Sequence, residues 1–186
     1  MKSAGLLLLL GLFSSAQAAE VTVLGGLNYA APSQKISNVG QNWTGDEAAA
    51  YGALIGDSLF NTPLELETGI LFLNEKYEQP GATNTTTTRT AGQTQLPILL
   101  RWNFDQWFSL GVGGYFAWAR GARDSTLSSS DQGLLGSLRA KFYISTELHF
   151  LLDARYQHGL SNQALIAGDS FNTRSIEILA GFGYNF

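Results

Sequence analysis

The chain has 186 residues, with 11 lysines and arginines against 15 aspartates and glutamates, which gives a formal net charge of −4. This acidic balance, without any basic stripe, argues against a nucleic-acid-binding surface. The absence of cysteine excludes a disulfide framework and a thiolate metal site. The 21 glycines and the 12% of aromatic residues are typical of closely packed strands with aromatic girdles at two membrane interfaces.

The first 18 residues have the pattern of a bacterial secretory signal peptide. Lys2 precedes an apolar run at residues 6–13, and the small-x-small sequence Ala16-Gln17-Ala18 follows. A transmembrane helix is the alternative interpretation, but this run is too short to cross a hydrocarbon core about 30 Å thick. We therefore predict cleavage before Ala19 and one mature domain of residues 19–186, secreted through the inner membrane.

Beyond residue 18 the chain has no run of about 18 apolar residues, which excludes a helical membrane protein. Apolar residues instead alternate with small or polar ones, and the mean hydropathy of +0.01 fits strands whose lipid-facing and lumen-facing positions cancel. This period of two predicts an all-β fold, an eight-stranded antiparallel up-and-down transmembrane β-barrel. The predicted strands are residues 20–30, 48–56, 63–77, 93–103, 107–119, 133–143, 147–159 and 176–186.

Three of these strands have features that need interpretation. The second begins with Ala48-Ala49-Ala50, for which a helix is the alternative, but glycines in the residues that follow favour a strand. In the third, Glu65 and Glu67 share one face, and this face must point inward because carboxylates in contact with lipid are costly. Pro97 in the fourth removes one donor from the hydrogen-bond ladder and predicts a bulge or a local kink.

The connections between strands alternate in length. The long ones, rich in Ser, Thr, Gly, Asn and Asp, are residues 31–47, 78–92, 120–132 and 160–174. Long loops outside and short turns in the periplasm are typical of outer-membrane barrels, so the N-terminus of the mature chain is expected in the periplasm. The Thr-rich residues 83–90 are expected to be mobile.

Two segments resemble the PorT-like family of outer-membrane β-barrels. Residues 95–101, Gln-Leu-Pro-Ile-Leu-Leu-Arg, resemble the x-IPLLLK strand of that family. Residues 153–162, Asp-Ala-Arg-Tyr-Gln-His-Gly-Leu-Ser-Asn, resemble its DARYxxGLTN strand, and the two occur in the expected order. The resemblance implies a small eight-stranded barrel of the OmpA/OmpX type. It supports the fold more than the function, because most family members have no assigned activity.

Charged residues fall repeatedly on the predicted lumen faces. Because an eight-stranded barrel is just wide enough for side chains to fill it, we expect these groups to pair across the lumen and plug it. An ion or proton path, or an openable gate, is the alternative interpretation. Strand direction places Asp153, Arg155 and Glu177 nearer the middle and the others toward the periplasmic end. The predicted network is Glu65, Glu67, Arg101, Arg139, Lys141, Glu147, Asp153, Arg155 and Glu177.

We predict no catalytic residue, no metal site and no cofactor. The string from His158 to Ser161 resembles the HxSN motif of the outer-membrane lipid A deacylase, but strand residues three apart point to opposite faces. His149 is expected inside the lumen as a hydrogen-bonded residue, with no second inward histidine or cysteine to complete a metal site. Loop carboxylates lack the Asp-x-Asp spacing of a Ca²⁺ site; these are Asp46, Glu47, Asp124, Asp131 and Asp169.

The sequence favours a non-enzymatic membrane scaffold that presents long extracellular loops for surface contact or envelope integrity. A narrow channel for ions or small solutes is the alternative, and a lipid A-modifying hydrolase is a third hypothesis. Expected partners are outer-membrane lipid, including lipopolysaccharide, and an unknown surface ligand, for which Trp43 is a candidate contact if it is not a loop anchor. The aromatic C-terminal strand, with Phe182, Tyr184 and Phe186, resembles the signal read by the barrel assembly machinery. We expect a monomer.

Overall fold

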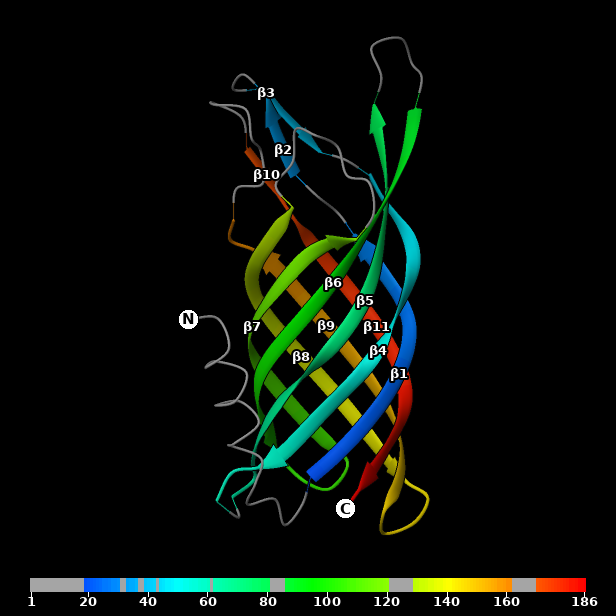
Figure 1. Ribbon diagram of the computed structural model, residues 1–186, viewed down its shortest axis with the longest axis vertical. Coiled ribbons are helices and arrows are strands. Elements are labelled where there is room, and N and C mark those ends of the chain that lie inside the picture. Colours follow the sequence, from blue (N-terminus) through cyan, green and yellow to red (C-terminus); the bar gives the residue numbers. More distant parts are fainter. Residues whose placement is uncertain are drawn as a thin grey trace.

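The computed structural model describes residues 19–30, 33–36, 39–42, 44–60, 62–80, 86–120, 129–161 and 170–186. Eight strands form one closed antiparallel barrel (Figure 1). β1 pairs with both β11 and β4, and this closes the ring. The fold class is therefore confirmed. Around the barrel the order is β1 (Ala19–Ala30), β11 (Arg174–Asn185), β9 (Leu148–Gly159), β8 (Ser130–Tyr143), β7 (Phe108–Arg120), β6 (Thr86–Asn103), β5 (Leu64–Pro80) and β4 (Thr44–Ser58).

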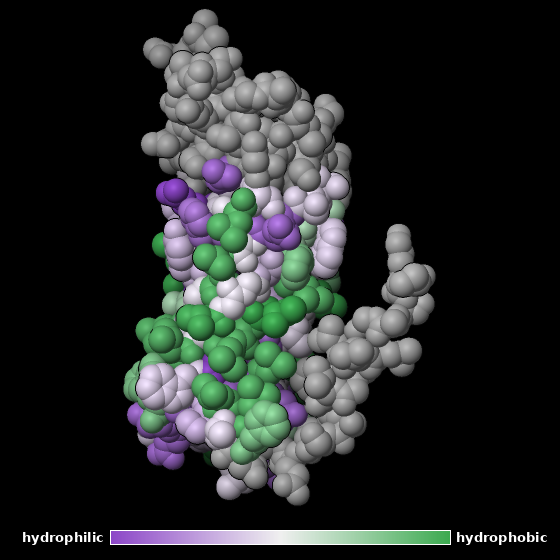
Figure 2. All heavy atoms as spheres, turned by 90° about the vertical axis from the view of Figure 1, so that its left-hand side faces the viewer, coloured by the Kyte–Doolittle hydropathy of each residue, from purple (hydrophilic) through white to green (hydrophobic). Residues whose placement is uncertain are grey.

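Alternation along each strand separates the outer wall from the interior. In β7, for example, Leu110 and Val112 are exposed while Ser109 is buried. Figure 2 shows the result on one side of the barrel, where an apolar band lies between more polar zones. No segment among the described residues forms a helix that could cross a membrane.

Aromatic side chains border the apolar band near the short turns. The rings of Trp102 and Phe104 meet edge to face at 5.0 Å, and Trp107 lies 6.4 Å from Phe142. Phe60, in the turn between β4 and β5, has a positive φ of 52° and is 94% exposed. Such aromatic groups suit a membrane interface, where a ring can contact both lipid and water.

Several strands extend past the predicted boundaries into the predicted loops. β5 and β6 have 17 and 18 residues and remain paired as far as Pro80 and Thr86. The predicted connection 78–92 is therefore wrong for residues 86–92, which are paired strand, while the mobility expected at residues 83–90 stays a prediction and residues 83–85 lie outside the described residues. β4 likewise begins at Thr44, inside the predicted connection 31–47.

A second, small sheet lies at the end of the barrel opposite the two described chain ends Ala19 and Phe186 (Figure 1). It contains β10 (Ser170–Asn172), β2 (Ser33–Ile36) and β3 (Val39–Asn42), in that order. Ser170 pairs with Lys35, so two predicted long loops meet in one sheet. We refer to these three strands as the surface sheet.

Of the bulge or local kink predicted at Pro97, the bulge is absent. The ladder between β5 and β6 has the same register on both sides of the proline, with Thr68 opposite Ile98 and Leu71 opposite Gln95, and the pairs between them are missing. The Thr68 hydroxyl donates to the Pro97 carbonyl at 2.8 Å. The proline therefore interrupts pairing without inserting a residue, whereas the register shift occurs in β4 between Asp46 and Ala50.

The predicted signal peptide of residues 1–18 lies outside the described residues, as do Trp43, Asp124 and Asp169.

Candidate functional site: the charged lumen

The lumen holds a compact group of three arginines and two carboxylates, which we call the arginine cluster: Arg101, Arg139, Arg155, Glu67 and Asp153. These residues come from β5, β6, β8 and β9, and each is at most 1% exposed. They meet because inward positions recur every second residue and because cross-strand pairing sets Arg139 opposite Asp153.

Both carboxylates of the cluster are shared among all three arginines. Glu67 lies 3.1 Å from Arg101, 2.5 Å from Arg139 and 2.8 Å from Arg155, measured between charged atoms. Asp153 Oδ2 lies 3.5, 2.7 and 2.9 Å from the same three guanidinium groups. Each buried charge therefore has several opposite partners, the condition under which burial of ions can be tolerated.

Serine hydroxyls add further hydrogen bonds to this cluster. Ser137 donates to Asp153 Oδ1 at 2.6 Å and accepts from Arg101 at 3.1 Å. Arg101 also donates to Ser109 at 3.3 Å. These short side chains sit on β8 and β7, so the cluster is tied to five strands of the wall.

A second group lies between the arginine cluster and the short turns, and we call it the mouth cluster: Glu20, Glu65, Lys141 and His149. Lys141 donates to Glu20 and lies 3.8 Å from Glu65. His149 Nε2 lies 3.3 Å from Glu20 Oε1, and Arg139 Nη1 lies 3.6 Å from the same oxygen. Glu20 thus links the mouth cluster to the arginine cluster.

Glycines on the inner wall leave the space that two of these side chains occupy. A Cβ added at Gly56 would lie 2.2 Å from Glu65 Oε1, and one at Gly183 would lie 2.2 Å from His149 Nε2. Larger residues at these positions would displace the mouth cluster.

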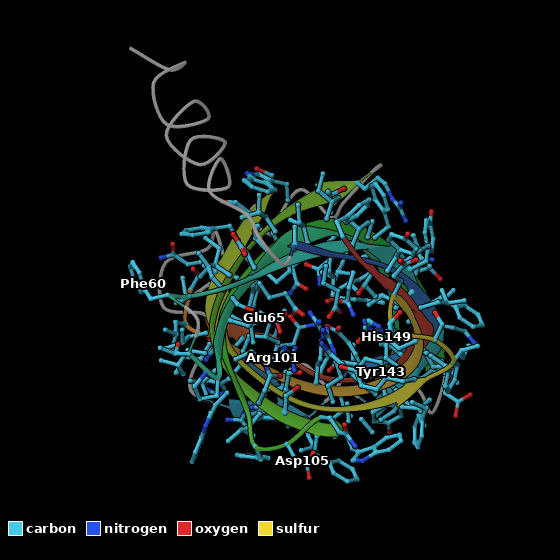
Figure 3. All side chains as sticks on the ribbon, turned by 90° about the horizontal axis from the view of Figure 1, so that it is seen from below. Phe60, Glu65, Arg101, Asp105, Tyr143 and His149 are labelled. Carbon is cyan, nitrogen blue, oxygen red and sulfur yellow. The ribbon has the colours of Figure 1, made fainter. Side chains whose placement is uncertain are left out.

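The mouth cluster faces a cavity of about 370 Å³ at the end with the short turns. Seen from this end, Glu65, Arg101 and His149 lie inside the ring of strands, while Phe60 points away from it (Figure 3). The side chains of Glu20, Glu65 and Lys141 are only 7–9% exposed. No residue of the arginine cluster lines this cavity, and each of them is at most 1% exposed.

The upper half of the lumen, toward the surface sheet, has a different chemistry. Glu177 accepts from Gln157 at 2.6 Å, and Glu75 accepts from Gln93 at 2.8 Å. Asp131 accepts from Tyr115 at 2.9 Å and from Thr173 at 2.5 Å. Two buried apolar clusters also line the lumen: Leu24, Ala50, Leu54, Leu71, Leu73 and Leu179 form one, and Leu99, Tyr115, Ala117 and Leu135 form the other.

Comparison with known proteins places this charged barrel in a family. Residues 4–186 match the family model described as outer membrane protein beta-barrel domain. The chain belongs to this outer-membrane barrel family. A search of curated protein sequences finds no match.

Solved structures agree with this assignment at the level of fold. The outer membrane protein AlkL in lipid bilayers is similar with a TM-score of 0.62 and 13% identity, over 92% of this chain and 91% of AlkL. Neisserial surface protein A has a TM-score of 0.52 and 14% identity, over 91% and 99% of the two chains. The N-terminal barrel of Pseudomonas aeruginosa OprF has a TM-score of 0.50 and 12% identity, over 92% and 98%. At these identities the likeness shows the fold alone.

Of the residues expected in the lumen of this outer-membrane barrel, eight are buried inside it: Glu65, Glu67, Arg101, Arg139, Lys141, Asp153, Arg155 and Glu177. Asp153 and Arg155 share one cluster with Arg101 and Arg139, so the expected division between periplasmic and middle groups does not separate them.

Glu147 is the exception, and its expected place in the network is wrong. It lies exposed in the turn before β9 and accepts a hydrogen bond from the Tyr184 hydroxyl at 2.9 Å. Strand alternation does not apply to this residue because the strand begins only at Leu148.

Sequence reasoning missed three buried carboxylates, Glu20, Glu75 and Asp131. The described interior therefore holds seven acidic against four basic side chains, instead of five against four. Glu20 shares its strand face with the inward Thr22, and this signal could have identified it. The predicted strand begins at residue 133, which places Asp131 in a loop, whereas β8 begins at Ser130 and includes Asp131.

The remaining predicted positions have clear locations. Phe182 and Phe186 are 56% and 75% exposed on the outer wall, and Tyr184 contacts Phe186 at 5.0 Å. No hydrogen bond joins His158 to Ser161 within the part of the chain that the structure describes, and no group of three His, Asp or Glu residues there could hold a metal ion.

Proposed function

We propose that this outer-membrane barrel is a closed, non-enzymatic scaffold that presents folded structure at the cell surface. The observation that carries the proposal is the arginine cluster, whose five side chains reach inward from β5, β6, β8 and β9 and are almost completely buried. Movement of an ion through this layer would require several mutually paired charges to separate in a narrow, water-poor interior.

The strands at the surface-sheet end of the barrel supply the structure that the scaffold would present. A membrane-spanning strand needs about 9–11 residues. β4, β5 and β6 have 15, 17 and 18 residues and extend toward the surface sheet (Figure 1). The surface sheet and the β5–β6 hairpin therefore supply ordered backbone beyond the membrane, which suits contact with a surface ligand or with neighbouring envelope components.

A narrow ion or solute channel is the second candidate. The seven buried acidic residues against four basic ones favour it, because an excess of one sign in a lumen selects ions of the other sign. Its path would have to pass the arginine cluster, which is the reason we place it second. A lipid A-modifying hydrolase has only the pair His158 and Ser161 in its favour, and a serine nucleophile needs its base within hydrogen-bond reach.

We also propose the finer placement among PorT-like barrels. Inward residues of the two segments that resemble that family build the lumen described above: Arg101 comes from the first, and Asp153, Arg155 and Gln157 come from the second. A family sequence pattern that specifies the side chains filling the lumen would fit a scaffold architecture shared by the family members.

Planar-bilayer recordings and a deletion variant test the scaffold proposal. Residues 31–43, which include β2 and β3, would be replaced by a short Gly-Ser linker. A scaffold predicts silent bilayers for both proteins and normal insertion of the deletion variant, measured by heat-modifiable electrophoretic mobility. Cells carrying the variant should lose autoaggregation or detergent resistance relative to wild type. Steady conductance of the wild type, or a deletion that changes neither cellular property, would contradict the proposal.

A further inference from the structure

A shallow apolar hollow of about 450 Å³ lies on the outer wall, over β1, β4 and β5. It forms because a small residue stands between two branched ones: Ala53 pairs with Val23 on one side and with Ile70 on the other. Tyr51 and Phe72 line the same hollow, with their rings 5.4 Å apart. Since this wall faces lipid, the natural occupant of the hollow is a hydrocarbon chain.

An arginine lies at the surface-sheet end of this hollow. Arg120 faces outward at the end of β7, and its side chain passes across β6 at Gly92, where an added Cβ would lie 3.2 Å from Nε. The guanidinium group donates to Asn74 on β5 at 2.8 Å and to the Tyr51 hydroxyl at 3.3 Å. Its Cζ lies 5.3 Å from the centre of the Phe72 ring. Arg120 thus contacts two residues that line the hollow.

The charge of Arg120 is not neutralised by the protein that the structure describes. Both of its hydrogen-bond acceptors are neutral, and no carboxylate among the described residues pairs with it. A guanidinium group has five N–H donors in a geometry that matches the oxygens of a phosphate. Its three contacts, with Tyr51, Asn74 and Phe72, hold it beside the hollow.

We propose that Arg120 and the hollow form a binding site for a phosphate-bearing lipid of the leaflet at the surface-sheet end. The phosphate lies on Arg120, and one acyl chain lies over Ala53 between Val23 and Ile70. The apolar hollow beneath the cation selects a lipid over free phosphate, because only a lipid fills both parts. The site is on the outer wall, so it does not depend on whether the lumen conducts.

The test uses purified diphosphoryl, hexa-acylated lipid A as the probe, titrated into the full barrel in dodecyl maltoside and followed by native mass spectrometry. Arg120→Ala should weaken binding by about tenfold or more, as expected for loss of a charge-assisted hydrogen bond. Ala53→Phe fills the hollow and should weaken binding to a similar extent. The matched control is Arg174→Ala, which removes another exposed arginine at the same end of the barrel, on β11.

Two further arms separate the lipid from other sources of the same chemistry. Excess inorganic phosphate should not displace lipid A from the wild type, and diacylglycerol should bind more weakly than lipid A does. Heat-modifiable mobility checks that every variant is folded. Unchanged affinity of Arg120→Ala or of Ala53→Phe would overturn the proposal, as would an equal loss in Arg174→Ala or displacement by inorganic phosphate.

Discussion

The two halves of the lumen hold their charges in different ways. All four buried basic side chains among the described residues belong to the arginine and mouth clusters, where four carboxylates surround them. In the upper half, Glu177 and Asp131 accept hydrogen bonds from the neutral donors Gln157, Tyr115 and Thr173. The difference indicates that the lower half depends on charge pairing, whereas the upper half depends on hydrogen bonds that a neutral side chain could replace.

The largest expected effect is that of Arg139→Ala. Arg139 contacts Glu67, Asp153 and Glu20, so its removal leaves three buried carboxylates with fewer partners. We expect a loss of about 3–5 kcal/mol in the free energy of unfolding, the usual cost of breaking a buried ion pair. Urea titration of the barrel refolded into lipid vesicles measures it. Arg174→Ala, at an exposed position, should leave the midpoint unchanged; a stable Arg139→Ala variant would show that pairing is not needed.

A matched pair of glutamate variants compares the two halves directly. Glu67→Gln removes a charge shared by three arginines, and it should lower the free energy of unfolding by about 3 kcal/mol. Glu177→Gln removes a charge whose carboxylate accepts from an uncharged amide, and it should change stability by no more than about 1 kcal/mol in either direction. The same vesicle titration applies to both. Equal losses would abolish the distinction between the halves.

Packing around the mouth cluster gives a smaller, steric test. Gly183→Ala places a Cβ against the His149 ring and should cost about 1–3 kcal/mol, as overpacking of a filled interior does. Gly136→Ala is the control, because a Cβ there meets nothing within 4 Å. Thermal unfolding in detergent compares the two, and His149→Ala in the Gly183→Ala background should recover part of the loss. A Gly183→Ala variant as stable as Gly136→Ala would mean that the mouth can rearrange freely.

Phe186, at the short-turn end of the barrel, should affect assembly with little effect on stability. Phe186 is 75% exposed, and its backbone N–H donates to the Ala19 carbonyl at 3.0 Å. We expect deletion of Phe186 to reduce assembly into the outer membrane, because recognition of the aromatic terminal strand would be weakened. Surface labelling of cells measures assembled protein, with Ile144→Ala as a control for loss of an exposed apolar side chain at the same end. Normal surface levels of the deletion variant would argue against the signal.

The alternation of side chains explains why most of the barrel could be predicted. Facing direction follows from a period of two, so Arg101, Arg139 and Asp153 could be assigned to the lumen without knowledge of their partners. The same rule fails where a strand has not begun, as at Glu147 in its turn. The rule must also be applied to every residue of a strand. Glu20 shares the inward face of Thr22, but the predicted network did not include it.

The sequence pattern could not predict pairing between segments that are far apart in the chain. The surface sheet joins Lys35 to Ser170, and neither segment shows a long alternation that would mark it as a strand. Glu67 meets Arg155 although 88 residues separate them, so the composition of the cluster could be predicted but its contacts could not. At Pro97 the missing donor was predicted correctly, but the sequence did not predict its structural result, a gap in one ladder beside the bond from the Thr68 hydroxyl to the Pro97 carbonyl.

Conductance in planar bilayers tests the central claim, that the arginine cluster closes the lumen, most directly. The wild type, Arg139→Ala and Arg174→Ala would be recorded under identical salt and voltage. The closed-barrel account predicts silence from the wild type and from Arg174→Ala, and discrete openings from Arg139→Ala. Steady conductance of the wild type would contradict it.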